Sequence, residues 1–133
     1  MIRTFLKHYL LTLLPFVVLD ALWLGTVAPK FYQAQIGHLM TPTPNWLAAI
    51  LFYLLFIVGV VVFVSGPGIQ SGDWKGAALR GALFGLVSYA TYDLTNLATL
   101  TGWPVLVTLV DLCWGTFLSA TTAILAVWLG RRF

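Results

Sequence analysis

The chain has 133 residues, of which 60% are hydrophobic and only 8% are charged. So few charges cannot cover a water-facing surface, which excludes an ordinary soluble domain and favours a surface that faces lipid. The net charge of +3 comes from Lys and Arg residues beside apolar runs, where they indicate membrane topology rather than binding to nucleic acid.

The first predicted membrane span covers residues 5–28 and follows Arg3 and Lys7. A basic start before an apolar stretch is also typical of a secretory signal. This stretch is longer than the apolar core of a signal, however, and Asp20 interrupts it. We therefore interpret it as a retained helix.

Apolar and aromatic side chains recur at helical spacing through residues 30–40, which predicts a short amphipathic helix on the outer membrane surface. Its Phe31 and Tyr32 favour an interfacial anchor, and a lid over a site is the alternative interpretation. The prolines at positions 42 and 44 end this helix before the next span.

Three further spans are predicted at residues 46–64, 77–100 and 105–129. A Gly-rich turn at residues 65–75 joins the second span to the third. The turn formed by Gly102, Trp103 and Pro104 makes the third and fourth spans an antiparallel hairpin. The sequence thus predicts an all-α protein, with residues 1–133 forming one integral membrane four-helix bundle.

Positive charges predict the orientation of this bundle. Arg3 and Lys7 precede the first span, Lys75 and Arg80 border the second turn, and two arginines follow the fourth span. The opposite side holds only Lys30. The positive-inside rule therefore places both termini in the cytoplasm.

Acidic residues give the most specific functional indication. Asp20, Asp93 and Asp111 lie inside apolar spans, where a charged carboxylate costs about 2.5 to 3.5 kcal/mol even on the lenient insertion scale. From the helix rise, all three are expected about 6 to 7 Å from the membrane centre on the outer side. If they face the interior, they form a cluster in the outer half of the membrane.

Small and polar residues form stripes on the third and fourth spans that would bring these acids together. No Lys or Arg is near enough to pair with them. Protons, a bound cation, a cationic ligand or hydrogen bonds must therefore neutralise the carboxylates. The candidate hydrogen-bonding and ligand-binding neighbours are Trp23, Tyr89, Tyr92, Asn96 and Trp114.

Two interpretations of the acids remain open. They form a binding site, or they are protonated and simply hold helices together by hydrogen bonds. If the ligand is a metal ion held by Asp20, Asp93 and Asp111, the absence of nearby Cys or His favours a hard divalent cation such as magnesium or calcium.

The stretches that contain these acids also carry a resemblance. The segments at 20–25, 44–48, 89–98 and 111–116 resemble signature stretches of the domain of unknown function 2177 family. The resemblance spans essentially the whole chain. It implies a bacterial inner-membrane protein with four spans, and it implies no particular activity.

Three functions from different classes follow. Binding or transport of a small cation, proton or cationic solute ranks first, and a non-catalytic membrane subunit or assembly partner ranks second. A membrane-embedded enzyme acting on lipid ranks third, because Ser88 and Ser119 lack a paired His and no catalytic residue stands out. A homodimer fits a bundle this small, although no motif specifies one.

Overall fold

The computed structural model describes all 133 residues, and every regular element in it is a helix. The prediction of an all-α chain is therefore confirmed. The long helices are α1 (Ile2–Thr26), α5 (Trp74–Thr99) and α6 (Val105–Arg132), together with α3 (Trp46–Val60), which continues into two shorter elements. Three continuous helices are long and apolar enough to cross a membrane, namely Ile2–Thr26, Trp46–Ser71 and Val105–Arg132.

The second long helix ends later than the sequence predicts. It does not end at Val64, because a π-helical turn η2 (Val61–Ser65) and helix α4 (Gly66–Ser71) continue it. Pro67 follows the π-helical turn directly, and because proline has no N–H, the continuing helix lacks one hydrogen bond at this point. The predicted Gly-rich turn thus shrinks to a few residues around Gly72, whose φ of 75° favours glycine.

The predicted amphipathic segment is helical, as α2 (Ala28–Ile36) and a 3₁₀ turn η1 (Gly37–Leu39). Side chains that accept backbone hydrogen bonds begin the helices that follow it. Asn45 accepts from the N–H of Ala48 at the start of α3, and Asp73 accepts from the N–H of Gly76 at the start of α5. These caps explain why both helices start beside polar residues.

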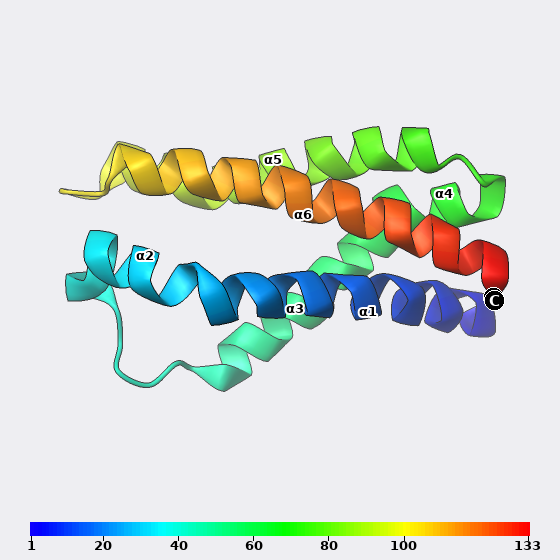
Figure 1. Cartoon of the computed structure of the whole chain (residues 1–133), viewed down its shortest axis with the longest axis horizontal. Coiled ribbons are helices and arrows are strands. Elements are labelled where there is room, and N and C mark those ends of the chain that lie inside the picture. Colours follow the sequence, from blue (N-terminus) through cyan, green and yellow to red (C-terminus); the bar gives the residue numbers. More distant parts are fainter.

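Helices α1, α5 and α6 run along the long axis of the molecule, whereas α3 crosses them obliquely (Figure 1). Both chain termini lie at one end of the molecule, which we call the terminal end. Helix α2 and the turn at Gly102 lie at the other, which we call the α2 end. Lys7 donates a hydrogen bond to the carbonyl of Phe133 and so ties the two termini together.

Helices α5 and α6 pack most closely. A Cβ added at Gly81 or Gly85 would collide with the backbone of α6, so these glycines allow the two helix backbones to meet. The fully buried core combines all the long helices and includes Phe16, Ile57, Val60 and Leu118. By contrast, Leu55 and Leu79 are more than 70% exposed, as expected of side chains that face lipid.

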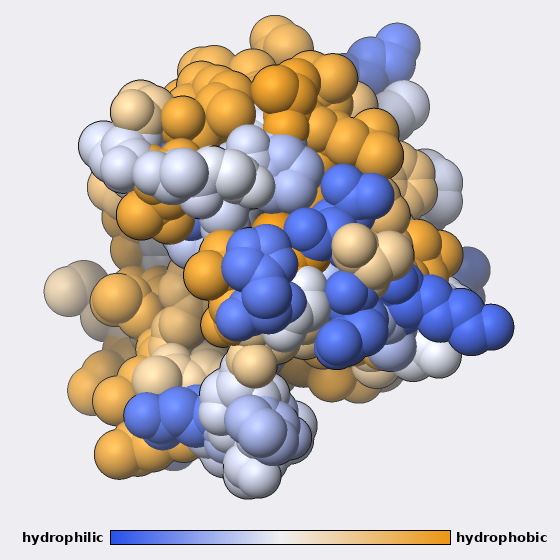
Figure 2. Space-filling model, turned by 90° about the vertical axis from the view of Figure 1, so that its left-hand side faces the viewer, coloured by the Kyte–Doolittle hydropathy of each residue, from blue (hydrophilic) through white to orange (hydrophobic).

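Polar residues gather across the middle of the α2 end and apolar residues flank them (Figure 2). The beginning of α3 lies apart from α5 and α6 near this end (Figure 1).

Candidate functional site

The structure brings two of the three predicted aspartates together. Asp93 on α5 and Asp111 on α6 line one cavity of about 350 Å³ and are close enough to share a hydrogen bond when one of them holds a proton. The contact of Gly85 with Gly115 favours this pairing, because it holds the two backbones close together about two turns from Asp93 and one turn from Asp111.

Asp93 is fully buried, and neither of its carboxylate oxygens accepts a hydrogen bond from a donor in the protein. A buried acid without donors is costly, since burial removes its water and nothing replaces it. Asp111 is 6% exposed and accepts a hydrogen bond from the hydroxyl of Tyr32 on α2. The pair therefore has one donor for two carboxylates.

Tyr32 reaches the pair from outside the spans. Burial raises the pKa of the Tyr32 hydroxyl, and its hydrogen bond to Asp111 raises that pKa further. The hydroxyl therefore stays protonated at neutral pH and remains a donor to Asp111. The sequence led us to favour an interfacial anchor for this residue; the structure adds its hydrogen bond to Asp111, although no residue of α2 lines the cavity.

Aromatic side chains build the rest of this region. Tyr89 and Tyr92 line the cavity with the pair, as do Phe52 on α3 and Ser88 on α5. The ring of Tyr89 lies against Gly115 of α6, so a larger residue at position 115 would displace it.

Trp23 and Trp114 are the predicted tryptophans, and their rings stack with centroids 4.5 Å apart. Trp23 also meets Tyr32 edge to face at 6.4 Å, which supports the ring that carries the donor hydroxyl. The two tryptophans position Tyr32 and do not line the cavity. Asn96 is half-buried and also lies outside the set of residues that line the cavity.

Asp20 occupies a separate environment on α1. It is 7% exposed and accepts a hydrogen bond from the hydroxyl of Tyr53 on α3 at 2.5 Å. It lines its own cavity of about 210 Å³ among apolar side chains such as Leu24 and Ile50. Tyr89 lies between the two environments, within electrostatic range of all three aspartates.

The three acids do not converge on one metal. No group of three His, Cys, Asp or Glu side chains in the chain is arranged to hold a metal ion. The pair alone offers carboxylate ligands from only two residues. Its geometry suits a single positive charge better than a fully coordinated divalent ion, which takes six or more oxygen ligands.

Sequence reasoning missed Tyr32 and Phe52 at the aspartate pair and Tyr53 as the partner of Asp20. Tyr53 had a usable signal, since it is the only tyrosine in an otherwise uncharged apolar span. Its hydroxyl needs a partner in the membrane, and a buried acid is the natural one. Tyr32 gave no such signal, because aromatic residues are common at membrane surfaces.

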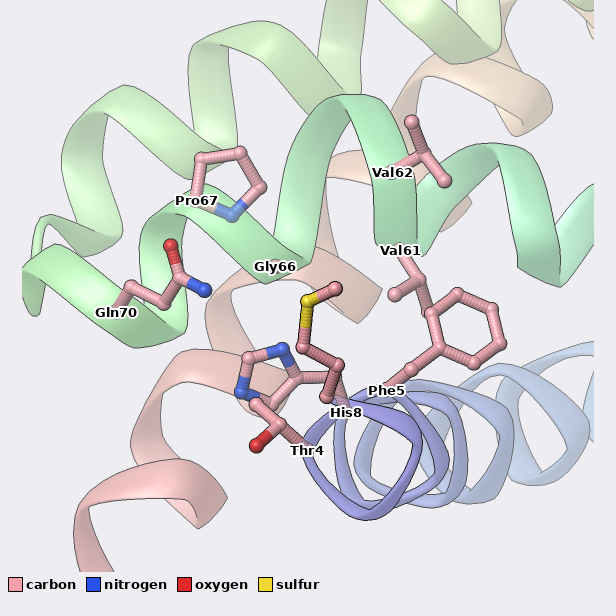
Figure 3. A pocket seen from close by; sticks show the side chains of 9 residues that line it. Thr4, Phe5, His8, Val61, Val62, Gly66, Pro67 and Gln70 are labelled. Carbon is pink, nitrogen blue, oxygen red and sulfur yellow. The ribbon is translucent and has the colours of Figure 1, made fainter.

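A larger cavity of about 500 Å³ lies at the terminal end, between α1 and α4 (Figure 3). The imidazole of His8 lines it and is 7% exposed. No carboxylate reaches this cavity, and apart from the amino terminus its polar groups are neutral or weakly basic, so it offers nothing to hold a cation. Its other labelled lining residues are Thr4, Phe5, Val61, Val62, Gly66, Pro67 and Gln70.

Comparison with known proteins gives a family and no activity. No curated protein and no solved structure is detectably similar to the chain. A family model described as "Predicted membrane protein (DUF2177)" matches residues 5–128. This match covers nearly all of the chain and includes Asp20, Asp93 and Asp111. The chain therefore belongs to the DUF2177 family of predicted membrane proteins.

Proposed function

We propose that the protein binds a small cation or cationic solute at the Asp93–Asp111 pair. The observation that carries this proposal is the fully buried carboxyl group of Asp93, whose two oxygens have no donor. A buried polar group without a partner is rare in folded proteins, and inside a membrane an ionisable one usually marks a functional site.

Charge balance points to a positively charged ligand. Two carboxylates lie side by side, and no Lys or Arg lines their cavity. Both cannot be ionised there without a compensating charge, because like charges in a low dielectric repel strongly. A proton on one acid leaves a single negative charge, which a monovalent cation neutralises. Binding of the cation and binding of a second proton therefore compete.

The proposed topology has four spans, with α5 as the one that is less apolar. Its 26 residues would extend about 39 Å, which is enough to cross a bilayer, and it packs against α6. Its polar side chains lower its average hydropathy. Several of them face α6 and the cavity, so they do not have to contact lipid. In this topology the terminal end is cytoplasmic, and the cavity lies in the outer half of a bacterial inner membrane, beneath α2.

Thermal unfolding of the purified protein in neutral detergent tests the binding site. We expect ammonium or another monovalent cation to raise the melting temperature of the wild type. The same cation should not raise the melting temperature of Asp93→Asn. Asp20→Asn is the matched control, since Asp20 is also buried, at 7% exposed, but is bonded to Tyr53. It should keep the cation response. The proposal fails if no cation stabilises the wild type, or if Asp93→Asn responds as the wild type does.

Uptake into vesicles separates transport from binding alone. Reconstituted protein that carries a radiolabelled methylammonium ion inward would show transport, and Asp93→Asn should abolish that uptake. Binding in detergent without uptake would instead support a binding subunit, whose partner is a second copy or another membrane protein.

A further inference from the structure

The aspartate cavity continues into an apolar groove between α3 and α5. This groove has a volume of about 520 Å³ and shares Phe52 and Ser88 with the cavity. It runs on past Gly59 and Phe84 to Phe63. At 1.5 Å per residue, the distance from Phe52 to Phe63 along the helix is about 16 Å. One end of the combined space is thus acidic, and the rest is a long apolar groove.

The groove carries no charged side chain. Phe56, Val62 and Phe63 are among the apolar residues that line it, and Phe63 stacks on Phe84 with centroids 6.2 Å apart. In the proposed topology the groove faces the lipid, so a ligand can enter sideways from the membrane. An acidic cavity at the end of an apolar groove matches a molecule with a positive head and an apolar chain.

We infer that the site takes a single-chain amphiphilic amine, with its ammonium group at Asp93 and Asp111 and its alkyl chain in the groove. This inference rests on the proposed function and names the chemical class of the ligand. Phe52, Tyr89 and Tyr92 surround the position of the head group. Aromatic rings attract ammonium ions by cation–π interaction, which favours an organic cation over a strongly hydrated metal ion.

The charge distribution selects against an aminophospholipid. Such a lipid carries a phosphate close to its amine, and that phosphate would lie near two carboxylates. No Lys or Arg lines either the cavity or the groove to receive it. Unpaired like charges at a buried site disfavour binding. The preferred ligand is therefore an amine without an adjacent anionic group.

Native mass spectrometry of the protein released from neutral sugar-detergent micelles tests this assignment. We expect retention of dodecylammonium, with at least tenfold weaker retention of the uncharged dodecanol. Phosphatidylethanolamine should be retained no better than dodecanol. Equal retention of dodecanol would overturn the role of the ammonium group. Stronger retention of phosphatidylethanolamine than of dodecylammonium would overturn the single-chain assignment.

A variant that fills the groove tests the position of the chain. A Cβ at Gly59 would lie 2.8 Å from the end of the Phe84 ring, so Gly59→Leu puts a side chain into the groove against a movable ring. It should weaken dodecylammonium binding at least tenfold and leave butylammonium binding unchanged. Gly25→Leu is the matched control, because a Cβ there meets nothing within 4 Å, and it should bind both amines as the wild type does.

The outcomes separate this inference from the proposed function. If butylammonium binds but Gly59→Leu retains dodecylammonium fully, the groove is not the chain site, and the proposed cation site stands. If neither amine nor any inorganic cation binds the wild type, the proposed function falls and this inference falls with it. Retained binding of butylammonium by Gly59→Leu also shows that this variant is folded.

Discussion

Asp20 and Asp93 are both buried acids in the same half of the molecule, but their surroundings differ. Asp20 accepts a hydrogen bond from Tyr53, which joins α1 to α3 among apolar side chains. Asp93 has no donor, faces a second carboxylate and opens into a cavity. A buried acid with a partner holds helices together, whereas one without a partner leaves room for a ligand. If the proposed function is right, the two interpretations of the aspartates that the sequence left open apply to different residues.

The largest expected effect comes from a substitution that separates Asp93 from Asp111, the pairing that Asp20 lacks. A Cβ at Gly85 would collide with the backbone of Gly115, which cannot move as a side chain can. Gly85→Leu should force α5 from α6, separate Asp93 from Asp111 and cost about 3 kcal/mol or more of stability. Thermal unfolding in detergent measures this loss. Gly25→Leu should unfold like the wild type, and equal melting of the two variants would refute the close helix contact.

Removal of a donor sharpens the assignment of Asp20. Tyr53→Phe leaves one oxygen of Asp20 without its hydrogen bond and should cost about 1 to 3 kcal/mol of stability. Ammonium binding should persist in this variant, because Tyr53 does not line the aspartate cavity. Chemical denaturation and ligand titration check the two effects separately. Loss of ammonium binding at unchanged stability would mean that Asp20 belongs to the site.

The smallest expected effect concerns the donor that serves Asp111. Tyr32→Phe removes the hydroxyl that stabilises ionised Asp111, so the pair should hold its proton more firmly against a competing cation. The loss of one hydrogen bond, worth about 1 kcal/mol, corresponds to roughly a fivefold weaker binding of ammonium. Titration of the variant by calorimetry measures the change. Tyr9→Phe removes a tyrosine hydroxyl that bonds only to the carbonyl of Leu54, and it should leave the affinity unchanged.

The sequence predicted the positions of the helices better than it predicted which helices pack against one another. Apolar length and turn residues located every long helix to within a few residues, except where α4 continues the second one. That exception has a local cause, since a π-helical turn carries the helix past Pro67 and through a Gly-rich segment that the sequence pattern predicts to be a turn. Two features, the fourth span and the cytoplasmic termini, stay predictions.

The site was predictable only in part for a related reason. The small residues on α5 and α6 indicated a close contact, and that contact brings Asp93 to Asp111. Helical spacing shows which face of its own helix a residue occupies, but it does not show which other helix that face meets. The partners Tyr53 and Tyr32 depend on how α3 and α2 pack, so they could not be assigned from spacing.

Infrared difference spectroscopy of the reconstituted protein tests the central claim most directly. Addition of dodecylammonium should weaken the absorption band of the protonated carboxylic acids, because the cation displaces the second proton of the Asp93–Asp111 pair while the shared proton stays. The band change should be lost in Asp93→Asn and retained in Asp20→Asn. An unchanged spectrum on addition of the amine, or the same change in Asp93→Asn, would contradict the account.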